Sequence, residues 1–169
     1  FRDPLTQDKI ELLESYDLVL VHRSTGSGGF DESATAWNQL QVPLLHGSSY
    51  MVRNDPNRWN WVDGSQNRAQ DTGFEILEGD HPIVKGLDVD VYNRELDFDH
   101  VTIDNGVGNG KLIAIVPASG NAGIIVWDEP GAFFDGGDQT HEFTRVFFPM
   151  LRYFEANCNC SFEAYSDNG

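Results

Sequence analysis

The sequence predicts an α/β domain, and two observations lead to that prediction. The first half of the chain reads as strand, loop, helix and strand, with residues 18–21 and 42–46 as the two strands. The second half alternates short apolar segments with Asn-Gly and Gly-Asn turns, which are typical of β-hairpins. No internal repeat or linker divides the 169 residues, so we expect residues 1–169 to form a single domain.

The first elements follow from the spacing of apolar side chains. Residues 5–14 repeat them at helical spacing and predict an amphipathic helix. Residues 18–21 form a continuous β-rich apolar run, which suits a parallel strand covered on both faces. After the glycine-rich loop 24–29, Asp31 can cap the following helix. Residues 42–46 return as a strand, which a right-handed crossover places parallel to the first one.

The second half of the chain is richer in predicted strands. Residues 50–73 show no sustained hydrophobic period and predict a long loop. Residues 80–87 contain proline and glycine and predict a turn. Short apolar segments joined by turns of Gly, Asn and Asp predict strands at 95–103, 111–117, 122–127 and 145–150.

The charge of the chain narrows its partners. It holds 27 Asp and Glu residues against 11 Lys and Arg, a formal net charge of −16. Such a chain repels nucleic-acid phosphates and anionic lipid headgroups, so we expect neither as a partner. No apolar run approaches the roughly 18 residues of a membrane-spanning helix, and we expect no membrane insertion. The acidity serves solubility, and it also suits an extracellular or cell-surface protein with calcium as a possible ligand; no other cofactor is implied.

The two cysteines lie close together near the end of the sequence. Cys158 and Cys160 are two residues apart, and a disulfide between them would be strained. Partners elsewhere, free thiols, or a soft metal held with other ligands all stay open. Asn159 also begins an Asn-Cys-Ser sequon for glycosylation.

A series of motifs covers most of residues 5–155 in a fixed order. They are residues 16–28, Trp37-Asn38, Pro43-Leu44-Leu45, Arg53 to Trp59, and Asp80-His81-Pro82-Ile83 with Gly86-Leu87. The series resembles the class I glutamine amidotransferase-like superfamily, in its branch of ThuA-like and secreted bacterial domains. The resemblance implies a flavodoxin-like three-layer sandwich with a mainly parallel sheet. It also implies a missing first strand and last helix, which a longer parent chain or another chain would supply.

In that superfamily a cysteine nucleophile occupies a sharp turn after a strand. The resemblance places this turn at residues 46–50, where His46 and Ser48 occur and no cysteine does. It therefore implies that a thiolate does not hydrolyse glutamine here. Ser48 is the remaining candidate nucleophile, and the alternative is that residues 47–49 simply turn the chain.

Two histidines extend this candidate catalytic group. His22 and His46 end adjacent predicted strands, and open α/β sheets bind ligands at the carboxyl ends of their strands. With Ser48, they could form a base and nucleophile facing a crevice. The alternative is that both imidazoles are hydrogen-bonded structural groups.

The segment from Arg53 to Trp61 suggests a binding site of another kind. Exposed Trp59 and Trp61, flanked by Arg53, Arg58 and several Asn and Asp residues, would suit sugar stacking and hydrogen bonding to hydroxyls. The alternative is that the sheet covers both indole rings.

Acidic residues near the end of the β-rich half raise the question of a metal site. Asp128, Asp135 and Asp138 surround a glycine-rich turn and are candidate calcium ligands. Their spacing does not match the twelve-residue calcium loop of helix-loop-helix proteins, and a solvated acidic face is the alternative.

The sequence alone supports three functional hypotheses. The first is a non-catalytic amidotransferase-like module of an exported or cell-surface bacterial protein, which acts in assembly or recognition through protein partners or self-assembly. The second is a hydrolase or carbohydrate-processing enzyme that uses the crevice at the strand ends. The third is a subunit of an extracellular polymer, whose neighbours complete the sheet and bury an apolar contact at its edge.

Overall fold

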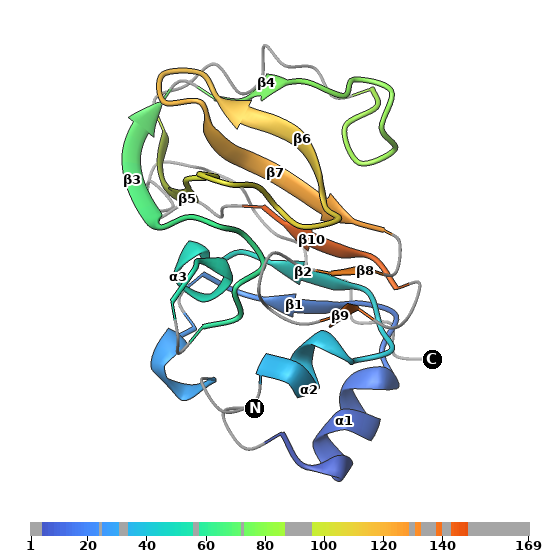
Figure 1. Ribbon diagram of the computed structural model, residues 1–169. Helices are drawn as coiled ribbons and strands as arrows, with labels where there is room; N and C mark the ends of the chain where they lie inside the picture. Colours follow the sequence, from blue (N-terminus) through green and yellow to red (C-terminus); the bar gives the residue numbers. More distant parts are fainter. Residues whose placement is uncertain are drawn as a thin grey trace, which may run out of the picture.

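A computed structural model of the chain shows a mixed α/β fold with an eight-stranded sheet and short helices (Figure 1). The structure describes residues 5–23, 25–30, 34–55, 58–71, 73–86, 96–128, 131–132, 138–139 and 143–148. The predicted cap Asp31 and the segment of Cys158, Asn159 and Cys160 lie outside these ranges. None of the helices within them has the length and apolar character of a membrane crossing.

Among the described residues, the segment up to residue 46 folds as the sequence predicts. Helix α1 is followed by a β-loop-α-β unit in which strands β1 and β2 pair in parallel, from Val19↔Leu44 to Val21↔His46. A shift of one residue would move the buried side chains of a strand to its other face, so burial of Val19 and Val21 fixes the register of the pair. The elements in order are α1 Gln7–Glu14, β1 Val19–Val21, the 3₁₀ turn η1 Ser27–Gly29, α2 Ala34–Asn38 and β2 Leu44–His46.

The prediction of one long loop at 50–73 is wrong. A short helix, α3 Ser49–Val52, opens this region, and strand β3 Gln66–Asp71 closes it. Strand β3 pairs antiparallel with β5 Leu96–Val101 over six residue pairs. Its sequence, Gln-Asn-Arg-Ala-Gln-Asp, carries almost no apolar signal. Its place in the sheet therefore depends on backbone pairing.

The remaining strands complete one sheet. They are β4 Glu75–Ile76, β6 Lys111–Val116, β7 Asn121–Trp127 and β10 Arg145–Phe147. Two further strands, β8 Gly131–Ala132 and β9 Asp138–Gln139, pair separately. The main path runs β1-β2-β10-β7-β5-β3, with β6 joined to β7 and β4 joined to β6. Figure 1 shows α1 and α2 beside β1, at the opposite end of the sheet from β4 and β6.

The prediction of a mainly parallel sheet is also wrong. Parallel pairing is confined to β1, β2 and β10, and the other pairs in the described part of the chain are antiparallel. The reason is local: a tight turn at 117–120 joins β6 to β7, and hairpin-linked strands must run in opposite directions. Gly120 has a φ of 69°, a left-handed value that glycine adopts without strain.

Strand β7 separates two apolar clusters. Its Ile125 and Trp127 belong to a large cluster with β1, β2 and the helices, whereas Ile124 and Val126 belong to a smaller cluster with β6. Successive side chains of a strand point to opposite faces, so the two clusters lie on opposite sides of β7. All seven residues of the strand are buried.

Buried Arg145 ties the parallel strands to the α2–β2 connection. Its guanidinium donates hydrogen bonds to the carbonyl oxygens of Val42 at 2.7 Å, of Asn38 at 3.5 Å and of Leu40. These bonds satisfy the carbonyl of Asn38 at the end of α2 and two buried carbonyls in the connection that follows it. Burial lowers the pKa of Arg145 to about 10, which leaves the side chain charged at neutral pH.

Candidate functional site

A continuous row of aromatic rings lies between α2 and β7. Trp37 stacks on Trp59 with ring centroids 5.5 Å apart, Trp59 lies 5.4 Å from Trp61, and Trp61 lies 5.2 Å from Trp127. Phe30 contacts the outer end of the row, 5.6 Å from Trp37. Such tilted and edge-on pairs stabilise a core beyond the area that they bury. We call Phe30 and the four tryptophans the tryptophan row.

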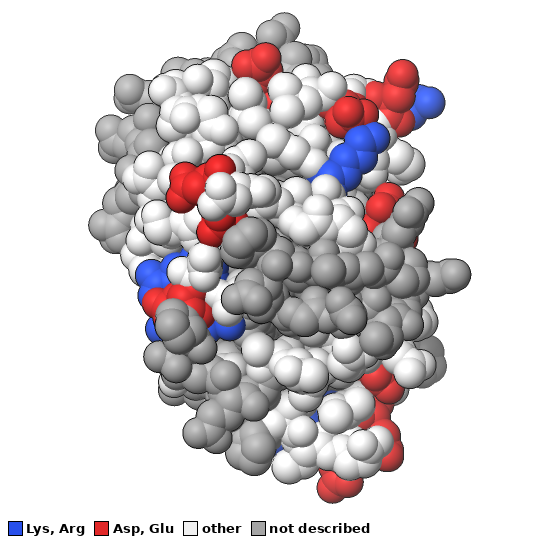
Figure 2. Space-filling view, viewed as in Figure 1, with Lys and Arg blue, Asp and Glu red and all other residues white. Residues whose placement is uncertain are grey.

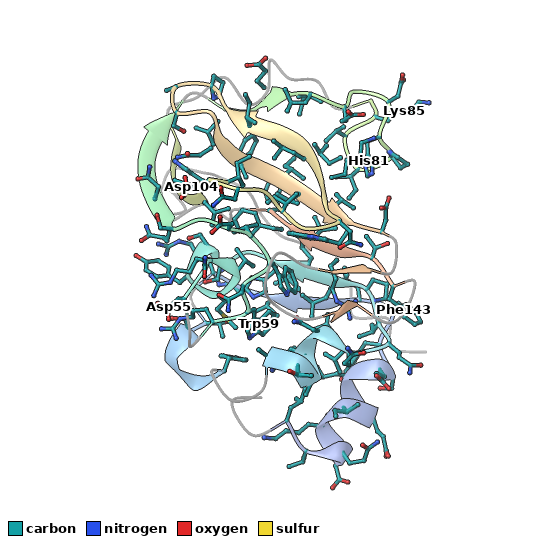
Figure 3. The ribbon with its side chains drawn as sticks, viewed as in Figure 1. Asp55, Trp59, His81, Lys85, Asp104 and Phe143 are labelled. Carbon is teal, nitrogen blue, oxygen red and sulfur yellow. The ribbon has the colours of Figure 1, made fainter. Side chains whose placement is uncertain are left out.

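The loop after α3 carries two of these rings into the interior. The backbone N–H of Trp59 donates to the carbonyl oxygen of Met51 at 2.9 Å, and that of Trp61 donates to Val52 at 3.0 Å. Asn60 between them has a φ of 52°, which turns the chain so that both indoles point inward. Figure 3 shows Trp59 between α3 and α2.

The expectation of exposed tryptophans is therefore corrected. Trp59 and Trp61 are both 0% exposed, so neither ring offers a face for sugar stacking in this structure. The alternative, that the sheet and helices cover them, is confirmed. Of the flanking arginines, Arg53 forms an ion pair with Asp55 at 2.9 Å, and both Arg53 and Arg58 are partly buried.

His46 lies against the tryptophan row at the end of β2. Its ring is 4.8 Å from Trp59 and 5.6 Å from Trp61, edge-on to both, and its side chain is fully buried. The backbone N–H of Ser48 donates to His46 Nδ1 at 3.1 Å, so the proton of the neutral ring is on Nε2. Burial lowers the pKa of His46 to about 3.

These features make His46 unsuited to act as a general base. The lone pair that could accept a proton is on Nδ1, and the Ser48 N–H already occupies it. The Nε2–H has no hydrogen-bond partner among the described residues and is enclosed by indole rings. The imidazole therefore acts as a neutral, aromatic part of the core.

The structure does not bring the three predicted catalytic residues together. His22 is exposed and lies one residue beyond the end of β1, whereas His46 is fully buried. Ser48 is 1% exposed, and its link to His46 runs through the backbone N–H. In the described part of the chain no imidazole contacts the Ser48 hydroxyl, and the predicted crevice is filled by tryptophan.

The proposed calcium ligands are placed only in part. Asp128 is exposed at the end of β7, and its carboxylate lies 3.8 Å from Nε2 of His81. Asp135 is outside the described residues, and Asp138 is placed only as backbone in β9. The described residues contain no group of three metal-binding side chains, so the calcium site stays a prediction.

A slot that the sequence analysis missed lies at the end of the sheet. Its volume is about 330 Å³, near the lower limit for binding pockets, and its walls are mostly apolar. Its lining residues are Leu13, Val19, Leu20, Val21, Thr25, Phe30 and Trp37. The sequence predicted β1 from its apolar run, but it did not predict that this strand would stand at the end of the sheet path.

Comparison with known proteins does not place this chain in a family. No protein-family model, no characterised protein and no solved structure matches this chain. The likeness to amidotransferase-like domains thus depends on the quoted motifs alone.

Proposed function

We propose that this chain is a non-catalytic, amidotransferase-like module of an exported or cell-surface bacterial protein, acting in assembly or recognition. The observation that carries the proposal is the filled strand end at His46. At the turn where the superfamily would place a nucleophile, this chain buries a neutral imidazole against Trp59 and Trp61. A catalytic group needs access to substrate and a free proton acceptor, and His46 has neither.

The parallel part of the sheet supports the fold portion of the proposal. Strands β1, β2 and β10 run parallel, and α2 connects β1 to β2. In this proposal they form the part of a flavodoxin-like three-layer sandwich that the chain retains, and the antiparallel strands extend it.

The polymer-subunit hypothesis gains support from a different observation. Leu18 and Leu20 at the end of the sheet are 53% and 52% exposed, as an edge completed by a neighbouring chain would require. It is a narrower form of the same assembly function.

A covalent probe for activated serines tests the absence of catalysis. We expect a fluorophosphonate to leave the folded protein unlabelled, because Ser48 is buried and no imidazole activates it. Ser49→Ala serves as the matched control at a neighbouring buried serine. Labelling that survives in Ser49→Ala and disappears in Ser48→Ala would overturn the proposal in favour of a hydrolase.

A further inference from the structure

The slot lies against β1, which is the last strand of the sheet path among the described residues. Its walls include Val19, Leu20 and Val21, three consecutive residues whose side chains alternate between the two faces of the sheet. Val19 and Val21 belong to the apolar cluster that also contains Leu13 and Trp37, so the cavity lies between β1 and the two helices and also touches Leu20. Leu13 of α1 and Trp37 of α2 form the opposite wall.

Hydrogen bonding shows which backbone groups face the slot. The N–H of Val19 donates to Pro43 at 2.9 Å, and the carbonyl of Val21 accepts from Gly47 at 2.9 Å. These bonds run toward β2, so the N–H and C=O of Leu20, between them, point the other way. Because no described strand lies beyond β1 in the sheet, these groups present the pattern that an added strand would pair with.

Exposed apolar side chains continue the surface beyond the slot. Leu18 and Leu20 are joined by Leu12 and Tyr16, which are 46% and 57% exposed. Exposed apolar side chains near a strand edge that no described strand covers are typical of an interaction site. The slot can therefore take one anchoring side chain while the outer residues contact its neighbours.

Charge decides between the possible occupants. Asp17 precedes the strand, and Asp8 and Glu11 are exposed on α1, where Figure 2 shows acidic side chains at the lower right. A second copy would bring the same carboxylates and another net charge of −16 to the contact. A basic segment instead gains attraction at the Asp17 end, whereas His22 and Arg23 follow the other end of β1.

We propose that the slot binds an extended apolar segment of another protein, with basic residues at the end near Asp17, as a strand added to β1. The segment pairs its backbone with Leu20 and inserts one apolar side chain between Trp37 and Leu13. This inference rests on the proposed recognition function and specifies its partner. Strand addition of this kind takes affinity from the main chain and specificity from the pocket.

Titration of a short peptide into the full chain tests the inference. The probe alternates leucine or valine with threonine and carries lysines at one end, and its binding is followed by amide chemical shifts. Leu20→Pro removes the outward N–H and leaves both bonds to β2 intact, so we expect affinity to fall about tenfold or more. Leu20→Thr is the matched control, because it keeps the N–H and should bind within about threefold of the wild type.

A second variant guards against misfolding of Leu20→Pro. Thr25→Phe fills the slot from its rim without altering β1, and we expect a similar loss of affinity. A peptide with glutamates in place of lysines should bind more weakly, with the difference shrinking in high salt.

Several outcomes would overturn the inference. The first is that the wild type does not bind the peptide, and the second is that all variants bind it equally well. The third is that sedimentation shows a dimer that Leu20→Pro dissociates, because the occupant would then be a second copy. The serine-probe experiment stays independent: labelling there refutes the non-catalytic function, whereas failed peptide binding refutes only this partner.

Discussion

Strands β7 and β1 belong to one sheet but differ in how completely they are buried. All seven residues of β7 are buried, with an apolar cluster on each face. In β1, Val19 and Val21 are buried, while Leu20 between them is half exposed. Both strands are runs of apolar residues, so the difference comes from their neighbours and not from their composition.

The comparison shows that a continuous apolar strand predicts that the strand is buried, but does not predict which segment buries it. At β7, strands β6, β10 and β5 pair with the backbone, and side chains from distant segments cover both faces. At β1, β2 is the only strand of the described part of the chain that pairs, and the slot lies against β1. If the proposed partner is correct, the second case is a surface whose cover comes from another protein.

The largest effect is expected at Arg145, which ties β10 to the connection between α2 and β2. Arg145→Met removes the donors to Val42 and Leu40 and leaves buried carbonyls unsatisfied, so we expect a loss of about 3 kcal/mol or more in the free energy of unfolding. The matched control is Arg53→Met, at a partly exposed ion pair with Asp55, which should cost less than about 1 kcal/mol. Urea denaturation measures both, and similar costs would show that the hydrogen bonds of Arg145 to the α2–β2 connection do not stabilise the fold.

A pair of glycine substitutions tests the difference in packing directly. A Cβ at Gly123 in β7 would lie 2.4 Å from the ring of Phe74, so Gly123→Ala should destabilise the fold by about 1–3 kcal/mol. At Gly28, near the slot, nothing lies within 4 Å of the added Cβ, and Gly28→Ala should stay within about 0.5 kcal/mol of the wild type. Equal effects on the thermal midpoint would remove the contrast between a closed and an open end.

His46 tests whether the interior beside the open end is dry. Its pKa of about 3 in the folded protein lies below the ordinary value of 6.5, so protonation favours the unfolded chain. Its contribution to stability is complete above about pH 6.5 and is lost as the pH falls toward 3, by about 1.4 kcal/mol per unit.

His46→Asn retains an acceptor for the Ser48 N–H and cannot titrate, so this part of the pH dependence should disappear. Urea midpoints at about pH 7 and about pH 5 measure the change. The control is His22→Asn, at an exposed position, which should leave the His46 contribution in place. A wild-type profile in His46→Asn would mean that water reaches the ring.

The sequence predicted the elements whose formation depends on neighbouring residues in the chain. The apolar runs at β1 and β2 and the helix between them could be recognised because adjacent residues specify them. The same holds for β6 and β7, whose hairpin turn contains Gly120.

The rest depends on pairings between distant segments. Polar β3 gave no hydrophobic signal, and its place follows from six backbone pairs with β5. The parallel pairing of β10 with β2 joins residues about a hundred positions apart in the sequence. His46 could be placed at a strand end, but its burial needed Trp59 and Trp61 from a loop that turns inward at Asn60. A list of strand-end residues therefore predicted a crevice where the fold builds a core.

The tryptophan row also makes the molecule a selective optical reporter. The chain has four tryptophans, and all of them lie in the row, with neighbouring rings between 5.2 and 5.5 Å apart. At such spacing excitation passes readily among the indoles, so their emission describes the row as a unit. Intrinsic fluorescence thus follows the path from α2 to β7 and is blind to local opening at β4, even while the rest of the sheet stays intact.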